Sequence, residues 1–201
     1  FDFVTSLGPV IVVEIKPFFT DHRWFVVRNM IALVRSINDR TLIPDVRKCA
    51  AHPDLRVRLE AIKTLLALEP TPPKGLLEDA IGDPDPKLAE KAIILVGNYG
   101  IKEAVDPLLQ IVAGNDVWGA RRPLRLRALH ALGELAEPRA LSQLQRFFTD
   151  SFLPWPAREE RRAAYESLAG YPSELRAPIV QRGLRSRDAY VRQVCEKIAN
   201  G

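Results

Sequence analysis

The stretch PDLRVRLEAIKTLLALEP, at residues 53–70, decides the fold because the chain repeats it in altered form. A related stretch, PDPKLAEKAIILVGNYG, follows at residues 84–100 and begins with the same proline and aspartate. In both, apolar residues recur at i, i+3, i+4 and i+7, which is the spacing of one face of an α-helix. Self-similarity at a fixed period is typical of repeat proteins, in which each copy is one structural unit.

The same apolar pattern recurs along the whole chain of 201 residues. Aligned on one slot of the motif, the copies lie at Val27, Arg58, Ala89, Arg125, Arg161 and Arg192, in steps of 31, 31, 36, 36 and 31 residues. Each first amphipathic helix is followed by a turn rich in helix-breaking residues and then by a second apolar helix. One such hairpin cannot bury its own apolar face, so neighbouring copies complete the core. The sequence therefore predicts an all-α fold, a right-handed α-solenoid (superhelix) of about five stacked helical hairpins.

The repeat spacing also predicts the domain organisation, a single domain over residues 1–201. Repeats are expected near residues 21–52, 53–83, 84–115, 116–151 and 152–186, with residues 187–201 starting a last copy. Residues 1–19 are interpreted as the tail of a preceding repeat, since Gly8-Pro9 would end a turn before an orphaned second helix. On this interpretation the chain is a fragment of a longer protein.

The repeated motif resembles HEAT repeats, especially the short HEAT-like units of phycobilisome lyases. Its pattern is Asp-Pro-Asp-x-x-Val-Arg-x-x-Ala, followed by apolar residues and glycine, and HPDLRVRLEAIKTLL, DPDPKLAEKAIILVG and PLRLRALHALGEL match it. The resemblance covers about residues 21–201 and implies that aspartates and arginines of neighbouring copies form polar contacts between repeats. The residues expected in this structural inter-repeat role are Asp54, Arg58, Asp85, Arg125, Arg161, Asp188 and Arg192.

The sequence offers no constellation of residues that would support catalysis. His22, His52 and His130 stand alone, without a second histidine or a cysteine at metal-ligand spacing. The phosphate-binding and nucleophile motifs are missing, and so is the His-Glu dipeptide through which HEAT-like iron enzymes such as deoxyhypusine hydroxylase hold metal. The acidic pairs Glu159-Glu160 and Asp83/Asp85 each open a helix, where carboxylates are favoured in solvent. We therefore predict no enzyme activity, no catalytic residue, no metal and no cofactor.

The position of the tryptophans indicates a candidate binding surface, since each of them falls at the start of a repeat. Two of them lie in the longer repeats, within the inserts GNDVWGARRPLR (residues 114–125) and DSFLPWPAREERR (residues 150–162). Insertions in a solenoid map to one edge, and tryptophan and arginine dominate interface hot spots. This edge predicts partner-binding residues, namely Trp118, Arg121, Arg122, Phe152, Trp155 and Arg158. The alternative, that each tryptophan fills a gap between helices, stays open.

The second helices are expected to present another surface, the concave face of the solenoid. Its charge passes from acidic, at Glu78 and Asp79, to basic, at Arg146 and Arg182, which are also predicted partner-binding residues. The whole chain shows the same trend. Residues 1–120 hold 14 Lys and Arg against 16 Asp and Glu, a net charge of −2, and residues 121–201 hold 15 against 9, a net charge of +6. An extended partner of opposite polarity would suit this gradient, and so would a solvated face without a partner.

These observations predict a non-catalytic protein–protein interaction scaffold within a larger cytoplasmic, bacterial-looking protein. A reducing compartment fits Cys49 and Cys195, which are isolated and expected to be buried. The most apolar run, PVIVVEI (residues 9–15), is too short to span a bilayer, so no membrane partner is expected. Nucleic-acid binding through the basic half of the concave face is the alternative, and a lyase-type chaperone for a tetrapyrrole is a third possibility that the repeat resemblance implies.

Overall fold

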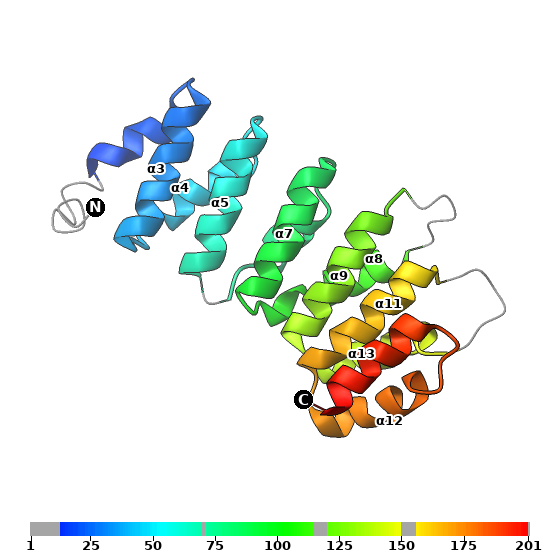
Figure 1. Ribbon diagram of the computed structural model, residues 1–201. Helices are drawn as coiled ribbons and strands as arrows, with labels where there is room; N and C mark the ends of the chain where they lie inside the picture. Colours follow the sequence, from blue (N-terminus) through cyan, green and yellow to red (C-terminus); the bar gives the residue numbers. More distant parts are fainter. Residues whose placement is uncertain (1–12, 70, 115–119, 150–155, 201) are drawn as a thin grey trace. The chain divides into compact units, whose positions relative to one another are not determined.

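The computed structural model describes residues 13–69, 71–114, 120–149 and 156–200. Every regular element in these ranges is a helix, and the elements follow one another as successive helical hairpins (Figure 1). The prediction of an all-α solenoid is confirmed. Trp118, Phe152 and Trp155 lie outside the described residues. The chain divides into two compact units, Phe1–Leu95 and Val96–Gly201, which are described separately below.

The first unit contains two complete hairpins and most of a further helix. Residues 13–15 are helical and lead into η1 (Lys16–Thr20). The hairpins are α3 (Trp24–Ile37) with α4 (Ile43–Cys49), and α5 (Leu55–Leu68) with α6 (Lys74–Ile81). Helix α7 (Pro86–Asn98) begins in this unit and ends in the second.

Helix α5 shows how the repeated motif forms its first helix. The Asp54 carboxylate accepts a hydrogen bond from the Arg56 N–H at 2.9 Å, which satisfies one of the free donors at a helix start. The apolar face predicted by the motif, Val57, Ala61 and Leu65, is buried. It packs against α3, and Figure 1 shows the two helices side by side. Burial of such apolar stripes is the main source of stability in a stacked hairpin.

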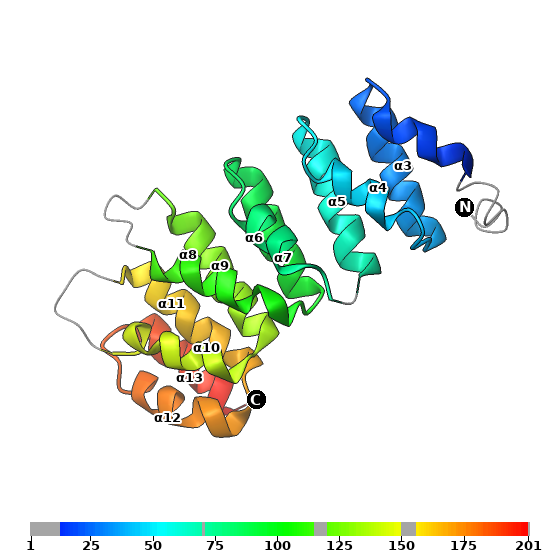
Figure 2. The same cartoon turned by 180° about the vertical axis from the view of Figure 1, so that it is seen from behind.

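The second unit contains the remaining helices. They are η2 (Lys102–Ala104), α8 (Val105–Ala113), α9 (Arg122–Leu135), α10 (Pro138–Gln143), η3 (Gln145–Phe147), α11 (Arg158–Ser167), η4 (Leu168–Gly170), α12 (Ser173–Gly183) and α13 (Ala189–Asn200). First helices α9, α11 and α13 pack in sequence, α9 on α11 and α11 on α13. Seen from behind, the second helices α8, α10 and α12 lie on the other side of this unit (Figure 2).

The backbone of α9 meets that of α11 and of the following η4 at two glycines, Gly133 in α9 and Gly170 in η4. A Cβ added at Gly133 would lie 2.8 Å from the backbone of Ser167, and one added at Gly170 would lie 2.0 Å from the carbonyl oxygen of Gly133. Real Cβ atoms do not come this close to backbone atoms, because van der Waals repulsion is steep at such distances. The two glycines are therefore required by packing.

The helices follow one another in pairs along the chain, and the assignment of each pair to one repeat stays a prediction. The pairs are α3 with α4, α5 with α6, α7 with α8, α9 with α10 and α11 with α12, and α13 stands in the expected last copy. The assignment of the whole chain to a single domain stays a prediction.

Candidate interaction surfaces

A buried ion pair joins the first helices α9 and α11. Arg125 Nε lies 3.2 Å from Glu160 Oε1, and both side chains are 1% exposed. Glu160 also accepts a hydrogen bond from the Ala157 N–H, 3.1 Å away, at the start of α11. The expectation that Glu160 is a solvated helix-start residue is wrong, because the carboxylate turns inward to neutralise a buried guanidinium group. Arg125, predicted to act between repeats, does contact the following repeat.

A second inter-repeat pair occurs in the first unit. Arg58 Nε lies 3.3 Å from Asp83 Oδ2, with both side chains mostly buried, so Asp83 is another carboxylate wrongly expected to be solvated. Asp83 Oδ1 accepts a hydrogen bond from the Asp85 N–H, and Asp85 in turn accepts one from the Lys87 N–H. Asp85 therefore caps the start of α7, while Arg58 bridges one repeat to the loop that opens the next.

Between α3 and α5 the structure adds a pair that the sequence interpretation missed. Arg35 Nη1 contacts Glu60 Oε1 and lies 3.3 Å from the Thr64 hydroxyl. Glu60 stands three residues after Val57, on the apolar face of its helix, and is buried. An acidic residue at an apolar position was the signal that could have revealed this pair, because buried carboxylates require a partner.

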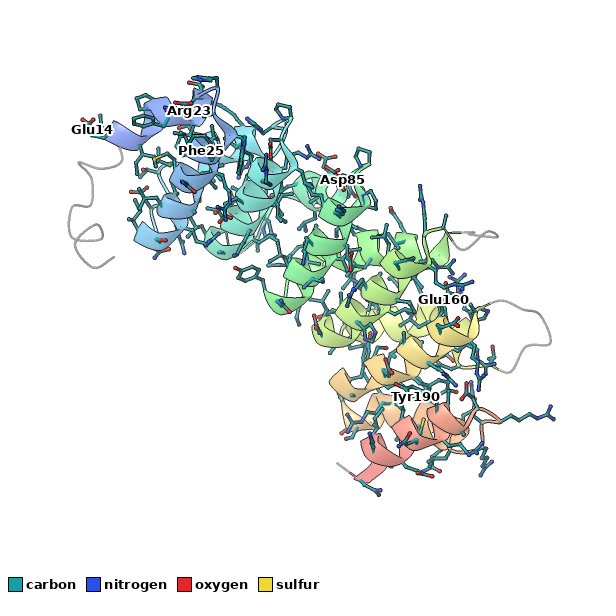
Figure 3. All side chains as sticks on the ribbon, turned by 45° about the horizontal axis from the view of Figure 1, so that its top comes forward. Glu14, Arg23, Phe25, Asp85, Glu160 and Tyr190 are labelled. Atoms are coloured by element: carbon teal, nitrogen blue, oxygen red, sulfur yellow. The ribbon has the colours of Figure 1, made fainter. Side chains whose placement is uncertain are left out.

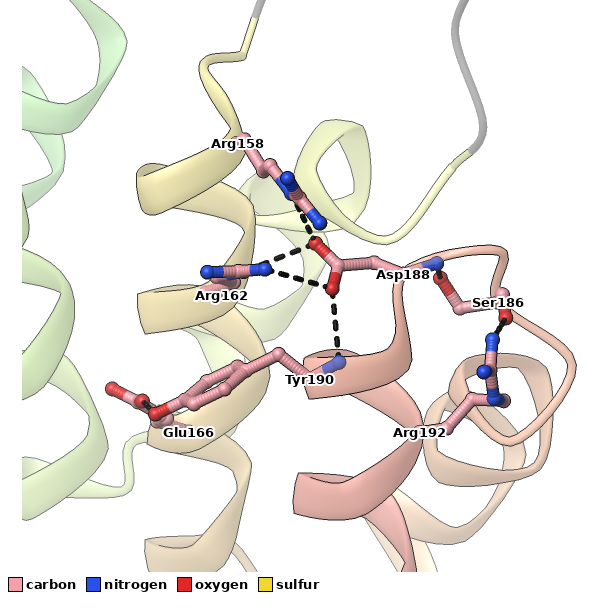
Figure 4. A network of polar contacts seen from close by, with 7 residues as sticks. All are labelled: Arg158, Arg162, Glu166, Ser186, Asp188, Tyr190 and Arg192. Carbon is pink, nitrogen blue, oxygen red and sulfur yellow. Dashed lines mark hydrogen bonds and ion pairs between the residues drawn. The ribbon is translucent and has the colours of Figure 1, made fainter.

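Asp188 is the centre of a polar network between α11 and α13 (Figure 4). Its Oδ2 accepts from Arg158 Nε at 2.8 Å and from Arg162 Nε at 3.0 Å, and its Oδ1 accepts from Arg162 Nη2 at 3.0 Å. The Tyr190 N–H adds a bond to Oδ1. The hydrogen bonds from Arg162, then those from Arg158, hold the pKa of Asp188 well below its usual range. Arg192 instead binds locally, to the Ser186 carbonyl at 2.7 Å, and Arg161 is a half-buried residue of α11.

We predict that this network makes stability depend on acid. The hydrogen bonds that favour the ionised form lower the pKa of Asp188 in the folded state, so its contribution is complete above the unfolded value of about 4. It is lost as the pH falls from there toward the folded pKa. Thermal unfolding followed by circular dichroism should show a steeper loss of melting temperature between about pH 4 and pH 2 in the wild type than in Asp188→Asn. Equal slopes would contradict this role for Asp188.

The arginines predicted to bind a partner all make contacts within the chain. Arg122 lies 4.0 Å from Glu159, and Arg158 binds Asp188. Arg146 donates to the Val112 carbonyl, and Arg182 lies 3.5 Å from the Phe148 carbonyl. Arg121, exposed, immediately precedes α9. The structure thus brings Arg158 into the Asp188 network, and the partner-binding role of these arginines stays a prediction.

The described tryptophan, Trp24, is half-buried at the start of α3. The Arg56 guanidinium carbon lies 3.2 Å from its ring centroid, a cation–π contact that comes from the following repeat. Beside it Phe25 keeps 47% of its surface exposed and lies near Arg23, as Figure 3 shows. Trp24 therefore serves packing between repeats, which is the alternative that the sequence left open for the tryptophans.

A groove of about 710 Å³ opens in the first unit, between the second helices α4 and α6. Figure 2 shows α4 and α6 on the same side of this unit. Small residues line it, namely Ala50, Ala51, Gly75, Ala80 and Gly82, and apolar Ile62 and Leu76 contribute to its surface. Its charged lining residues are Arg47, Arg58, Glu78, Asp79 and Asp83. A mostly apolar concavity with a few polar groups is the usual form of a binding site.

Neither a metal-binding cluster nor a membrane-spanning helix occurs in the described ranges. Across residues 13–69, 71–114, 120–149 and 156–200, no three His, Cys, Asp or Glu side chains come together in a way that could hold a metal ion. Nor does any helix in these ranges have the length and hydrophobicity needed to cross a membrane.

Cys49 and Cys195 are buried free thiols, and burial raises the pKa of each to about 11.

The stacked hairpins and their inter-repeat pairs place the protein in the class of helical-repeat proteins. Residues 73–160 match the family model described as HEAT repeats, the repeat class that the sequence motif resembles. The closer resemblance to the repeats of phycobilisome lyases stays a prediction.

Solved structures that are similar to the chain include two of low sequence identity. One is an engineered protein from the Northeast Structural Genomics Consortium, with a TM-score of 0.54 and 14% identity, covering 93% of this chain and 94% of that one. The other is human deoxyhypusine hydroxylase in complex with glycerol, with a TM-score of 0.49 and 17% identity, covering 98% and 86%. At such identities the first likeness concerns the fold alone. No curated protein sequence matches the chain.

Proposed function

We propose that this chain is a non-catalytic interaction scaffold that holds a peptide segment of a protein partner in the groove between α4 and α6. The single observation that carries the proposal is the groove itself. It has the volume of a ligand site, and it lies on the face of the second helices where the sequence interpretation expected binding. HEAT repeats are helical-repeat scaffolds whose extended surfaces suit protein interaction.

The small residues of the groove favour a peptide as its occupant. An added Cβ at Gly75 would meet nothing within 4 Å, and Ala51 is exposed across the groove. Small side chains let the backbone of a ligand come close to the helices, while the half-buried Leu76 offers apolar surface to its side chains. An amphipathic segment with one or two apolar anchors fits this shape.

The charges on the rim favour a basic residue beside the apolar anchors. Arg58 is paired with Asp83, and Arg47 with Glu69 on α5's C-terminal side. Of the remaining carboxylates, Glu78 lies 3.6 Å from Lys74 on its own helix. Asp79 is exposed and makes no ion pair within the described ranges. The uncompensated charge of the groove is therefore negative, which complements lysine or arginine in the ligand.

Two exposed arginines of the second unit, Arg122 and Arg158, belong to the same proposal as a further contact surface. Arg122 and Arg158 keep 45% and 68% of their side chains exposed although each has an internal partner. The pair of Arg122 with Glu159 is long and exposed, and such pairs are weak, so a partner carboxylate can compete for the Arg122 guanidinium at little cost.

We predict that reversing the charge of the groove rim weakens binding of a defined peptide. The probes are two fluorescein-labelled, twelve-residue amphipathic peptides with the same leucines, one carrying lysines and the other glutamates. Fluorescence anisotropy should show binding of the lysine peptide to the wild type and a loss of at least about tenfold in affinity in Glu78→Lys/Asp79→Lys. The matched control Glu174→Lys/Glu196→Lys makes the same charge change at exposed positions of the second unit and should leave the affinity within about twofold.

Other outcomes would replace the proposal. Equal binding of both peptides, or equal loss in the control variant, would mean that the groove does not recognise them. Tight binding of a single-stranded oligonucleotide with a steep salt dependence would favour the nucleic-acid alternative.

A further inference from the structure

We infer that the loop between α12 and α13 is a docking point for an acidic segment of a protein partner. The inference rests on two features of this loop. Hydrogen bonds order it, and it carries two exposed arginines whose charges have no counter-ion within the described residues. This surface is distinct from the groove between α4 and α6, and it lies in the other unit, so either inference can fail alone.

Hydrogen bonds fix the loop from both ends. The Ser186 N–H donates to the Gly183 carbonyl at 3.0 Å, and the Arg192 guanidinium donates to the Ser186 carbonyl at 2.7 Å. The Ser186 hydroxyl accepts from the Asp188 N–H at 3.2 Å, and Asp188 is anchored to α11 through Arg162 (Figure 4). A binding loop that is already ordered loses little conformational entropy when a partner arrives.

The side chains on this fixed loop are strongly basic. Arg185 and Arg187 flank Ser186 and are exposed. Within the described part of the chain, neither guanidinium group has a hydrogen-bond or ion-pair partner. Nearby, Asp188 is already neutralised by Arg158 and Arg162. The loop therefore has a positive charge that the chain does not balance.

The same place shows which ligand chemistry suits such arginines. Arg162 grips both oxygens of the Asp188 carboxylate at 3.0 Å, the bidentate geometry that guanidinium groups form with carboxylates. Arg185 and Arg187 can present the same donors outward, to a glutamate or aspartate of a partner.

A short acidic peptide fits this surface better than a nucleic acid. Carboxylates also lie on the two helices that Asp188 links, Glu159 and Glu166 on α11 and Glu196 on α13. A continuous phosphate backbone would be repelled where it passes these acids, since its affinity depends on an unbroken row of cations. A segment with a few acidic side chains can meet Arg185 and Arg187 and avoid them.

The test measures binding of a labelled peptide with four glutamates separated by serines to the full chain by fluorescence anisotropy. Arg185→Glu/Arg187→Glu should reduce its affinity at least tenfold. The control Lys87→Glu/Lys91→Glu, the same charge change at exposed positions of α7, should change it less than twofold. Arg185→Lys/Arg187→Lys keeps the charge but loses the bidentate geometry, and it should give an intermediate loss. Circular dichroism of each variant should match the wild type, because neither arginine holds the fold.

Four results would overturn the inference. They are a lack of binding of the glutamate peptide to the wild type, equal binding of the same peptide with glutamines, and equal losses in both charge-reversal variants. The fourth is tighter binding of a single-stranded oligonucleotide that depends on Arg185 and Arg187, which would make the loop a nucleic-acid contact.

Discussion

Replacing Arg125 with alanine is expected to lower the free energy of unfolding by about 3–5 kcal/mol. The reason is the burial of its partner, since Glu160 is 1% exposed and would keep a charge without a counter-ion. Removing one member of a buried ion pair costs more than the pair itself contributes, because the remaining charge stays desolvated. Urea unfolding followed by far-UV circular dichroism should show the shift as a lower midpoint with an unchanged slope.

The double variant Arg125→Met/Glu160→Leu is the control for this prediction. Replacing both charges with apolar residues of similar volume removes the desolvation penalty as well as the attraction, and such replacements are often neutral or stabilising. We therefore expect the double variant to be much more stable than Arg125→Ala. If the double variant loses as much stability as Arg125→Ala, the loss in Arg125→Ala does not come from the uncompensated charge of Glu160.

Replacing Gly170 with alanine should cost about 3 kcal/mol, the upper end of the range for overpacking. Its new Cβ would lie 2.0 Å from the Gly133 carbonyl oxygen, so α9 must separate from η4, which directly follows α11. Backbone cannot move aside as the tip of a side chain can, and separation also exposes apolar surface between the helices. Thermal and urea unfolding would measure the loss, and Gly133→Ala should behave in the same way.

Gly75→Ala is the matched control, because a Cβ at this position meets nothing within 4 Å. Gly75 lies in the first turn of α6, where alanine is a better helix former, so the substitution should be neutral or stabilising by up to about 1 kcal/mol. A destabilisation at Gly75 as large as that at Gly170 would show that general helix effects, and not the close backbone contact, control these positions.

The fold could be predicted from sequence because local sequence patterns determine its helices and their caps. The apolar spacing in residues 53–70 recurs at every copy, and the aspartates before the first helices cap them, as Asp54 and Asp85 do. Both signals act within about one turn of helix, so they can be seen without knowing what the helix packs against.

The polar contacts between repeats were predicted less well, because a carboxylate at a helix start has two favourable orientations. It can face solvent, as was expected of Glu160, or turn inward if the neighbouring copy supplies a cation. Arg125 is that cation, and it stands 35 residues earlier, beyond the reach of any local pattern. The groove could not be predicted from sequence for a similar reason, because its existence depends on the distance between α4 and α6.

The glycine contact between α9 and α11 means that the copies in this chain are not interchangeable modules. The slot that Gly133 fills holds Leu66 in the copy of residues 53–83 and Arg35 in the copy before it. Each of those side chains is suited to its own neighbour, and Arg35 reaches Glu60 from there. Swapping the first helix of residues 53–83 into the place of α9 would set a leucine against the backbone of Ser167. The order of the copies is therefore fixed by contacts between particular neighbours. A longer array would need added copies whose side chains fit those of the copies that they contact.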